Sequence, residues 1–187
     1  MVAGEVCDHD GMLRFLLRIL LDLASIPGVI AHELGHQVAC WLTGTRVREV
    51  CYFRFGLPPG YVVHDRPATI WRHLIVASGP FALNTLLGLG LGWLARQGHS
   101  WVRDPFWTRV VLTWLAVAVA MHAFPSLTDA NNVMEDIWRK GVRWYVRLLA
   151  TPLGGLLYLG AFAGWIWLDL AWGLVVGVWL PGRWPLS

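Results

Sequence analysis

The sequence is short of charged residues and of cysteine. Only 14% of its 187 residues are Asp, Glu, Lys or Arg, whereas soluble domains carry about 25%. This shortage argues against an ordinary water-soluble domain. The three cysteines include no C-x-x-C pair, which argues against a disulfide framework. The net charge of +3 is small, and we expect no nucleic-acid partner.

Apolar residues take the place of the missing charges. Hydrophobic residue types make up 56% of the chain, the mean hydropathy is +0.51, and 13 residues are Trp. Indole rings favour the interface between lipid headgroups and hydrocarbon. One domain is the default at this length. We therefore predict a single integral membrane domain over residues 1–187, embedded in a lipid bilayer.

The N-terminal stretch lacks the pattern of a cleaved signal peptide. It includes Glu5, Asp8 and Asp10, and charges interrupt the apolar run that starts at Met12. We interpret residues 12–24 as an amphipathic helix at the membrane interface or as the opening turns of the first span.

Three apolar stretches have the character of membrane-spanning helices. They are residues 26–43, 71–95 and 107–124, and they form a core over about residues 26–135. Gly44 is placed to cap the first helix, and Pro80 is expected to kink or restart the second.

The second predicted span also carries signals of close packing. Gly88, Gly90 and Gly92 alternate along it, and small residues let helix backbones approach each other. Asn84 puts a polar group at membrane depth, where it needs a partner.

A fourth apolar stretch occupies residues 149–180. As one straight helix it would be about 48 Å long, against a hydrocarbon core of about 30 Å. We therefore expect either a tilted, overlong helix or a span followed by a second element.

A change of period follows the first span. Polar and apolar residues alternate imperfectly over residues 46–56, Pro58-Pro59-Gly60 is a turn signal, and residues 61–64 can return as a second strand. This pattern predicts a small β-hairpin. Residues 133–148 carry many charges and are expected to form a surface helix or loop.

The most specific pattern is H-E-L-G-H at residues 32–36, inside the first predicted span. In a helix, His32 and His36 lie one turn apart on one face, so both imidazoles can bind one metal ion, most often zinc. Glu33 is placed to take a proton from a water on the metal. This is the H-E-x-x-H signature of zinc hydrolases. Cys40, one turn further, is expected to be a packing residue.

The alternative is a chance match with two packed histidines. Context argues against it, because ionisable groups in an apolar span are costly unless they are bound or functional.

A catalytic zinc usually has three protein ligands and one open position. Asp129 is the best candidate for the third ligand, because it lies in an irregular polar stretch, residues 124–132, on the same membrane side as the end of the motif helix. His122 is the rival, since imidazole is an excellent zinc ligand; otherwise it orients Asp129 or faces the interface. Asp169 lies inside the fourth apolar stretch, either as a functional acid or as an acid at a helix break.

The Lys and Arg residues are unevenly divided between the two sides of the predicted membrane. Residues 44–72 and 125–148 share one side and carry nine of them, and the other side has six at most. The positive-inside rule assigns the richer side to the cytoplasm. We therefore expect the active-site end to face the cytoplasm.

Three blocks of the sequence resemble the site-2 protease family of intramembrane zinc metalloproteases. Residues 30–47, I-A-H-E-L-G-H-Q-V-A-C-W-L-T-G-T-R-V, are similar to the metal-binding helix of that family and the strand after it. Residues 77–87, A-S-G-P-F-A-L-N-T-L-L, are similar to its Gly-Pro and Asn helix. Residues 122–130, H-A-F-P-S-L-T-D-A, are similar to the segment that ends in its Asp ligand. The family usually has two residues between Gly-Pro and Asn, and here there are three.

The resemblance implies an all-α integral membrane fold, with a three-span core, a small β-hairpin and a C-terminal apolar extension. It implies a zinc-dependent intramembrane endopeptidase that binds Zn²⁺ through His32, His36 and Asp129 and uses Glu33 as its catalytic base. Asn84 would hydrogen-bond the substrate backbone or oxyanion, or would only bond a neighbouring helix. The substrate would be a transmembrane or membrane-tethered protein.

The alternative is a metal-binding membrane scaffold or chaperone without catalytic activity. The presence of Glu33 argues against it, because a purely structural site needs no base.

Overall fold

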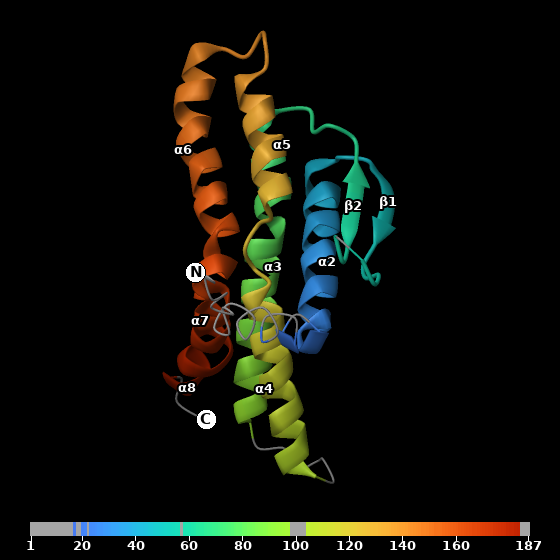
Figure 1. The fold of residues 1–187 in the computed structure, drawn as a ribbon, viewed down its shortest axis with the longest axis vertical. Helices are drawn as coiled ribbons and strands as arrows, with labels where there is room; N and C mark the ends of the chain where they lie inside the picture. Colours follow the sequence, from blue (N-terminus) through green and yellow to red (C-terminus); the bar gives the residue numbers. More distant parts are fainter. Residues whose placement is uncertain (1–16, 18–19, 22, 57, 98–103, 184–187) are drawn as a thin grey trace, which may run out of the picture.

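The computed structural model describes residues 17, 20, 21, 23–56, 58–97 and 104–183 as an elongated, mostly helical bundle with one small sheet (Figure 1). The amphipathic helix expected over residues 12–24 falls largely outside the described residues. The elements are α2 (Ile26–Thr43), β1 (Val47–Cys51), β2 (Tyr61–His64), α3 (Ile70–Arg96), α4 (Pro105–Met121), α5 (Leu127–Trp138), α6 (Trp144–Ala161), η1 (Ala163–Ile166), α7 (Leu168–Leu174), η2 (Val175–Trp179) and α8 (Leu180–Arg183).

Helix α2 coincides with the first predicted span. Pro27 stands in its first turn, where its missing N–H costs nothing. Gly44 ends the helix in the left-handed conformation, with φ of 68°, and its N–H donates to the Trp41 carbonyl. The predicted cap at Gly44 is therefore confirmed.

Helix α3 forms the centre of the bundle and packs against both α2 and α4. It starts at the N-cap Thr69, whose side chain accepts a hydrogen bond from the Arg72 N–H. The helix continues through Pro80, so it does not restart there. Within the described ranges, α3 is the one helix long and apolar enough to cross a membrane, and α4 is apolar but shorter. The three-span core stays a prediction.

Glycines let the central helices approach closely. A Cβ atom on Gly35 would lie 2.6 Å from the Pro80 Cα atom, and one on Gly79 would lie 2.5 Å from the Gly35 carbonyl oxygen. In the same way, Gly88 faces Ala120 of α4. Gly90 faces open space, so close packing does not involve every glycine that the sequence analysis singled out.

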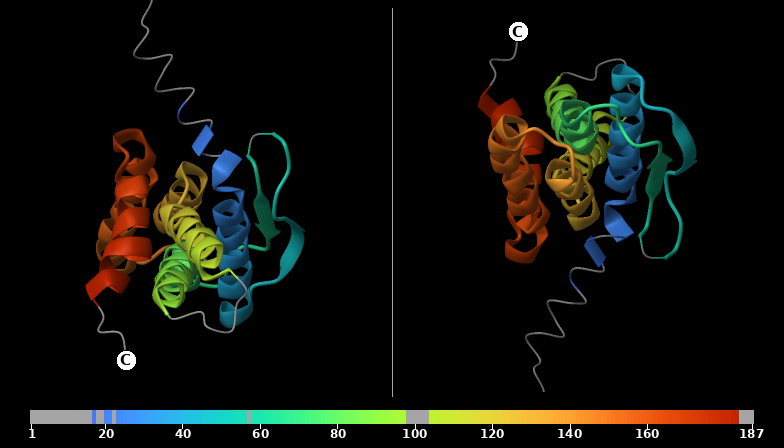
Figure 2. Two further views of the ribbon diagram at one scale, coloured as in Figure 1. Left: turned by 90° about the horizontal axis from the view of Figure 1, so that it is seen from below. Right: turned by 90° about the horizontal axis from the view of Figure 1, so that it is seen from above.

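The predicted hairpin is confirmed. Strands β1 and β2 pair antiparallel, with Cys51 opposite Tyr61 and Val47 opposite His64. The sheet lies on the outer flank of α2, on the side of the molecule opposite α6 (Figure 2).

The sequence predicts irregular structure over residues 124–132. This prediction is wrong from Leu127 onward, because α5 begins there. The reason is a capping box. The N-cap Ser126 hydroxyl accepts from the Asp129 N–H, and the Asp129 carboxylate accepts from the Ser126 N–H. Asp129 therefore lies in the first turn of a helix.

The sequence predicts a surface helix or loop over residues 133–148, but one face of α5 is part of the hydrophobic core. Its Ala130, Val133 and Ile137 are fully buried in a cluster that includes α3 and α6 side chains. The chain then turns at Gly141, with φ of 90°, and returns as α6.

The C-terminal apolar stretch is one helix, α6, followed by further elements, so the single overlong helix that was one of the two expected arrangements is wrong. After α6 the chain forms the short helices η1, α7, η2 and α8. Trp167, with φ of 61°, separates η1 from α7 and is the one non-glycine residue with positive φ in the described ranges.

Candidate metal centre

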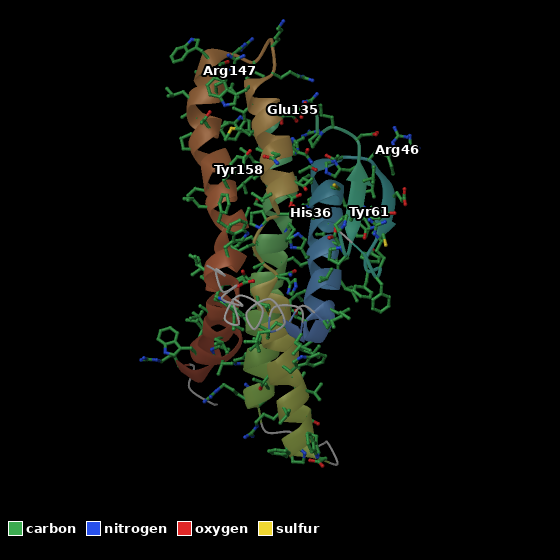
Figure 3. The ribbon with its side chains drawn as sticks, in the orientation of Figure 1. His36, Arg46, Tyr61, Glu135, Arg147 and Tyr158 are labelled. Atoms are coloured by element: carbon green, nitrogen blue, oxygen red, sulfur yellow. The ribbon has the colours of Figure 1, made fainter. Side chains whose placement is uncertain are left out.

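Three side chains from two helices converge in the middle of the molecule. His32 and His36 come from α2, where their rings lie 5.0 Å apart, and Asp129 comes from the first turn of α5. One potential ligand atom of each residue lies within 4.8 Å of the other two. Figure 3 shows His36 on the side of α2 that faces α5. The structure thus brings together the three residues that the sequence analysis named as metal ligands.

Each histidine is oriented by a backbone carbonyl from another segment. The His32 Nδ1–H donates to the His122 carbonyl at 2.8 Å, and the His36 Nδ1–H donates to the Val76 carbonyl at 3.0 Å. Because a carbonyl oxygen can only accept, Nδ1 carries the proton in both rings. The Nε2 lone pairs are then left for a metal, which is the usual arrangement around metal-binding histidines.

The Asp129 carboxylate is oriented by the cap of its own helix. Its Oδ2 atom accepts from the Ser126 N–H at 2.8 Å and from the Ser126 hydroxyl at 2.6 Å. Its Oδ1 atom lies 3.5 Å from His36 Nε2. The two hydrogen bonds from Ser126 favour the ionised form of the carboxylate, which is the form that binds a metal.

This donor set fits zinc. Zinc–nitrogen and zinc–oxygen bonds of about 2.0–2.2 Å in a tetrahedron put neighbouring ligand atoms about 3.4 Å apart. The 3.5 Å between His36 Nε2 and Asp129 Oδ1 matches this separation. Two neutral imidazoles and one carboxylate are also a ligand set found in catalytic zinc sites.

Glu33 lies in the wall of the same cavity. The cavity has a volume of about 810 Å³, and His32, Glu33, His36 and Asp129 all line it. Glu33 is buried, and the hairpin comes very close to it. A Cβ atom on Gly60 would lie 2.7 Å from the Glu33 Cγ atom and 3.0 Å from its Oε1 atom. A side chain at this point would displace either Glu33 or the hairpin.

The structure brings His122 near the site without making it part of the three-residue group. Its ring Nδ1–H donates to the Ala118 carbonyl at 3.0 Å, one turn back along α4. Its backbone carbonyl, by contrast, accepts from His32. His122 therefore orients His32 through its backbone carbonyl.

Asn84 is fully buried and bonds two other segments. Its Nδ2 atom donates to the Gly28 carbonyl at 3.2 Å and to the His122 carbonyl at 3.0 Å. Asn84 and His32 thus share one acceptor, the His122 carbonyl. Asn84 is absent from the cavity lining, so this geometry favours a helix-bonding role over direct contact with substrate.

A second polar cluster escaped the sequence analysis. Asp136, two turns after Asp129 on α5, forms an ion pair with Arg66 and accepts from His73 Nδ1 at 2.6 Å. Arg66 follows the hairpin and His73 belongs to α3, so Asp136 connects three segments. Asp129 and Asp136 are seven residues apart on one helix face, and this spacing could have indicated that both carboxylates point inward.

Two further residues singled out in the sequence, Asp169 and Cys40, lie outside the group of three potential metal ligands. Asp169 is buried at the start of α7 and lines the same cavity, and it lies at the helix break that one reading of the sequence expected. Cys40 is fully buried with Ala39 and Val76, which confirms it as a packing residue.

Two histidines one helical turn apart, a glutamate beside them and an aspartate from a later helix form an arrangement typical of zinc peptidases. A comparison with protein families agrees with this class. Residues 25–141 match the family model DUF3267, described as "Putative zincin peptidase". Because the match covers more than half of the chain, from α2 through α5, the protein belongs to this family. Its class is therefore zinc metallopeptidase, with zinc as the implied metal.

Neither a curated protein nor a solved structure matches the chain in the corresponding comparisons.

Proposed function

We propose that the protein is a zinc-dependent intramembrane endopeptidase of the site-2 protease type. This proposal rests on the convergence of His32 Nε2, His36 Nε2 and Asp129 Oδ1 beside Glu33. In each of the three side chains, the other polar atom already takes part in a hydrogen bond. Such preorganised ligands need little rearrangement when the metal binds.

The dimensions of α3 support a membrane position. Trp71 and Trp93 are exposed near its two ends. With a rise of 1.5 Å per residue, they are about 33 Å apart along the helix, close to the thickness of the hydrocarbon core. Exposed Trp residues at both ends are typical of membrane-spanning helices. We propose α2 and α4, which pack against α3, as the other two spans of a multi-pass core.

The site would then lie just below one membrane surface. His36 bonds the carbonyl of Val76, which is five residues after Trp71. Five residues of helix correspond to about 8 Å. At this depth, water can reach the cavity from the near surface while a transmembrane substrate approaches from the side. The excess of Lys and Arg at this end supports a cytoplasmic orientation.

The chemistry assigned to the chain's own residues is peptide hydrolysis. Zinc bound by His32, His36 and Asp129 would lower the pKa of a water molecule and polarise the scissile carbonyl. Glu33 accepts a proton from the attacking water and then donates it to the leaving amine, so that its carboxylate returns to the starting state. Because Gly60 has no Cβ atom, the hairpin leaves room for that carboxylate in the cavity wall.

We propose that the substrate binds as an extended segment beside β2. Tyr61, Val62 and His64 of this strand line the cavity. The described part of the sheet contains two strands, so β2 has one edge that β1 does not pair. An unwound stretch of a membrane-spanning or membrane-tethered protein can add to such an edge through backbone hydrogen bonds.

The test is peptide cleavage by the purified chain and by Glu33→Gln, each reconstituted in liposomes with a mixture of membrane proteins. New N-terminal amines are labelled and counted. We expect the wild type to generate new N-termini, and Glu33→Gln to bind the same amount of zinc and generate none. Equal cleavage by both proteins would contradict the role of Glu33. No cleavage by a zinc-loaded wild type under any lipid condition would contradict the peptidase proposal.

A further inference from the structure

The turn between α5 and α6 projects beyond the rest of the bundle at one end of the molecule (Figure 1). We define this α5–α6 tip as residues 138–147. It presents three large aromatic side chains to the outside. Trp138 is 58% exposed, Trp144 is 73% exposed and Tyr145 is 42% exposed. Several large rings gathered on one turn form an apolar patch, and such a patch is more typical of an interaction surface than scattered single residues are.

The tip is also strongly basic. It contains Arg139, Lys140, Arg143 and Arg147 and no acidic residue. The nearest carboxylates precede it on α5, where Asp136 is already paired with Arg66 and His73, and Glu135 is exposed. The tip therefore carries a local charge of about four positive units that its own residues do not neutralise.

Contacts within the tip hold its basic and aromatic groups together. The Arg147 guanidinium lies 5.6 Å from the Trp138 ring centre and donates to the Arg139 carbonyl at 3.0 Å. The Arg143 guanidinium donates to the Tyr145 hydroxyl at 2.7 Å. Arg139, Lys140 and Trp144 stay exposed. The turn is thus an ordered surface that alternates cations with amphipathic rings.

The level of the tip along the bundle is set by a contact between helices. Asp136 of α5 bonds His73 of α3, two residues after Trp71. Trp138 therefore stands near the level of Trp71, and residues 139–143 lie just beyond it. Arg46 of the hairpin lies toward the same end as Arg147 (Figure 3). If Trp71 marks the membrane interface, the tip lies in the headgroup layer.

We infer that the α5–α6 tip binds anionic phospholipid headgroups of the leaflet nearest the metal centre. This inference rests on the proposed membrane position and not on peptidase activity. Phosphates that carry a net negative charge would pair with Arg139, Lys140 and Arg143, and the rings of Trp138 and Trp144 would lie at the headgroup–hydrocarbon boundary. Zwitterionic lipids have the same headgroup–hydrocarbon boundary but no net charge, so the tip should bind them less strongly than anionic lipids.

The opposite end of the molecule provides a control surface. It also exposes aromatic rings, at Trp93 and Trp107, but its described basic residues are spread over three helices. They are Arg96, Arg109 and Arg183, and all three are exposed. The triple variant R96Q/R109Q/R183Q removes as many charges as R139Q/K140Q/R143Q, and it leaves the tip unchanged.

The experiment uses the full chain in a neutral detergent. The wild type and both triple variants are mixed with equal amounts of phosphatidylglycerol and phosphatidylcholine, and bound lipids are counted by native mass spectrometry. We expect the wild type and R96Q/R109Q/R183Q to retain phosphatidylglycerol preferentially. We expect R139Q/K140Q/R143Q to lose this preference by roughly tenfold or more. The charge-conserving variant R139K/R143K should keep it. Zinc content, measured on each sample, reports whether the fold and the metal centre are intact.

Three outcomes would overturn the inference. One is a wild type with no preference between the two lipids. Another is an equal loss in both triple variants, which would mean that net charge alone matters. The third is binding of a soluble oligoglutamate peptide at the tip in place of phosphatidylglycerol, which would indicate an acidic protein partner. Each of these can occur with normal zinc binding and cleavage, so failure here is distinguishable from failure of the proposed function.

Discussion

The Nε2 atom of His36 lies 3.5 Å from the Oδ1 atom of Asp129. The two residues belong to different helices, and each is held from behind. Val76 accepts from the far side of the His36 ring, and Ser126 donates to the other carboxylate oxygen. The separation therefore results from the packing of α2, α3 and α5, and it sets the space available for a metal ion.

Asn84 is predicted to act on the metal centre through His32. Replacing it with Ala removes two buried hydrogen bonds, one of them to the carbonyl that also orients His32. We expect Asn84→Ala to destabilise the protein by about 1–3 kcal/mol and to weaken zinc binding by roughly 10-fold or more. Competition with a zinc chelator measures the affinity.

A matched control is Thr85→Ala, on the same helix. Thr85 accepts a hydrogen bond from Trp172 and does not contact the carbonyl that orients His32. Its zinc affinity should equal that of the wild type. If Asn84→Ala binds zinc normally and loses only kcat, then Asn84 contacts the reacting groups and the indirect role is wrong.

Gly60 is predicted to control the position of Glu33. A methyl group at this position would lie 2.7 Å from the Glu33 Cγ atom, which is closer than two carbon atoms can approach. We expect Gly60→Ala to reduce the cleavage rate at least tenfold, because the carboxylate or the hairpin must move, while zinc content stays at the wild-type level. The rate of new N-terminus formation and the zinc content are measured on the same sample.

Gly56→Ala serves as the control in the same hairpin. The nearest atom to a Cβ at Gly56 is 4.0 Å away, on the Arg54 side chain. This variant should cleave at the wild-type rate. Equal rate losses in both variants would show that the effect is general loosening of the hairpin.

Asp136 is predicted to stabilise the fold by connecting α5 to α3 and to the segment after the hairpin. Asp136→Ala leaves His73 and Arg66 without their shared carboxylate. Because Arg66 is 45% exposed, solvent screening reduces the effect, and we expect a loss of about 1–3 kcal/mol. Thermal unfolding of the zinc-free protein in detergent measures it.

The exposed pair of Arg48 and Asp65 is the comparison for this variant. Both side chains are about half exposed and form two hydrogen bonds at 2.7 and 2.8 Å. Asp65→Ala should lower the unfolding temperature clearly less than Asp136→Ala does, because solvent screens an exposed pair. If the two variants lower the unfolding temperature equally, Asp136 has no special structural role.

Local signals made several features predictable from the sequence. The helix over residues 26–43 and its cap at Gly44 depend on neighbouring residues, as does the turn at Pro58-Pro59-Gly60. The positions of His32 and His36 follow from helical spacing alone. These predictions are confirmed because the interactions that determine these features join residues that are close together in the sequence.

Other features depend on contacts between distant segments. Asp129 was identified, but the sequence was read as irregular where Ser126 and Asp129 form a capping box. The S-x-x-D spacing of Ser126 and Asp129 is itself a local signal for a helix start, and it follows directly after Pro125. The shared acceptor of His32 and Asn84, by contrast, is a backbone carbonyl, which carries no sequence signal. Multi-pass membrane insertion stays a prediction.

The most direct test of the account is the zinc content of three purified proteins in detergent: the wild type, Asp129→Ala and His122→Ala. We predict about one zinc ion per wild-type chain, a nearly complete loss in Asp129→Ala, and retention in His122→Ala, because that variant keeps the backbone carbonyl that orients His32. Loss of zinc in His122→Ala with retention in Asp129→Ala would contradict the assigned ligand set. A wild type without stoichiometric metal would contradict the metal centre itself.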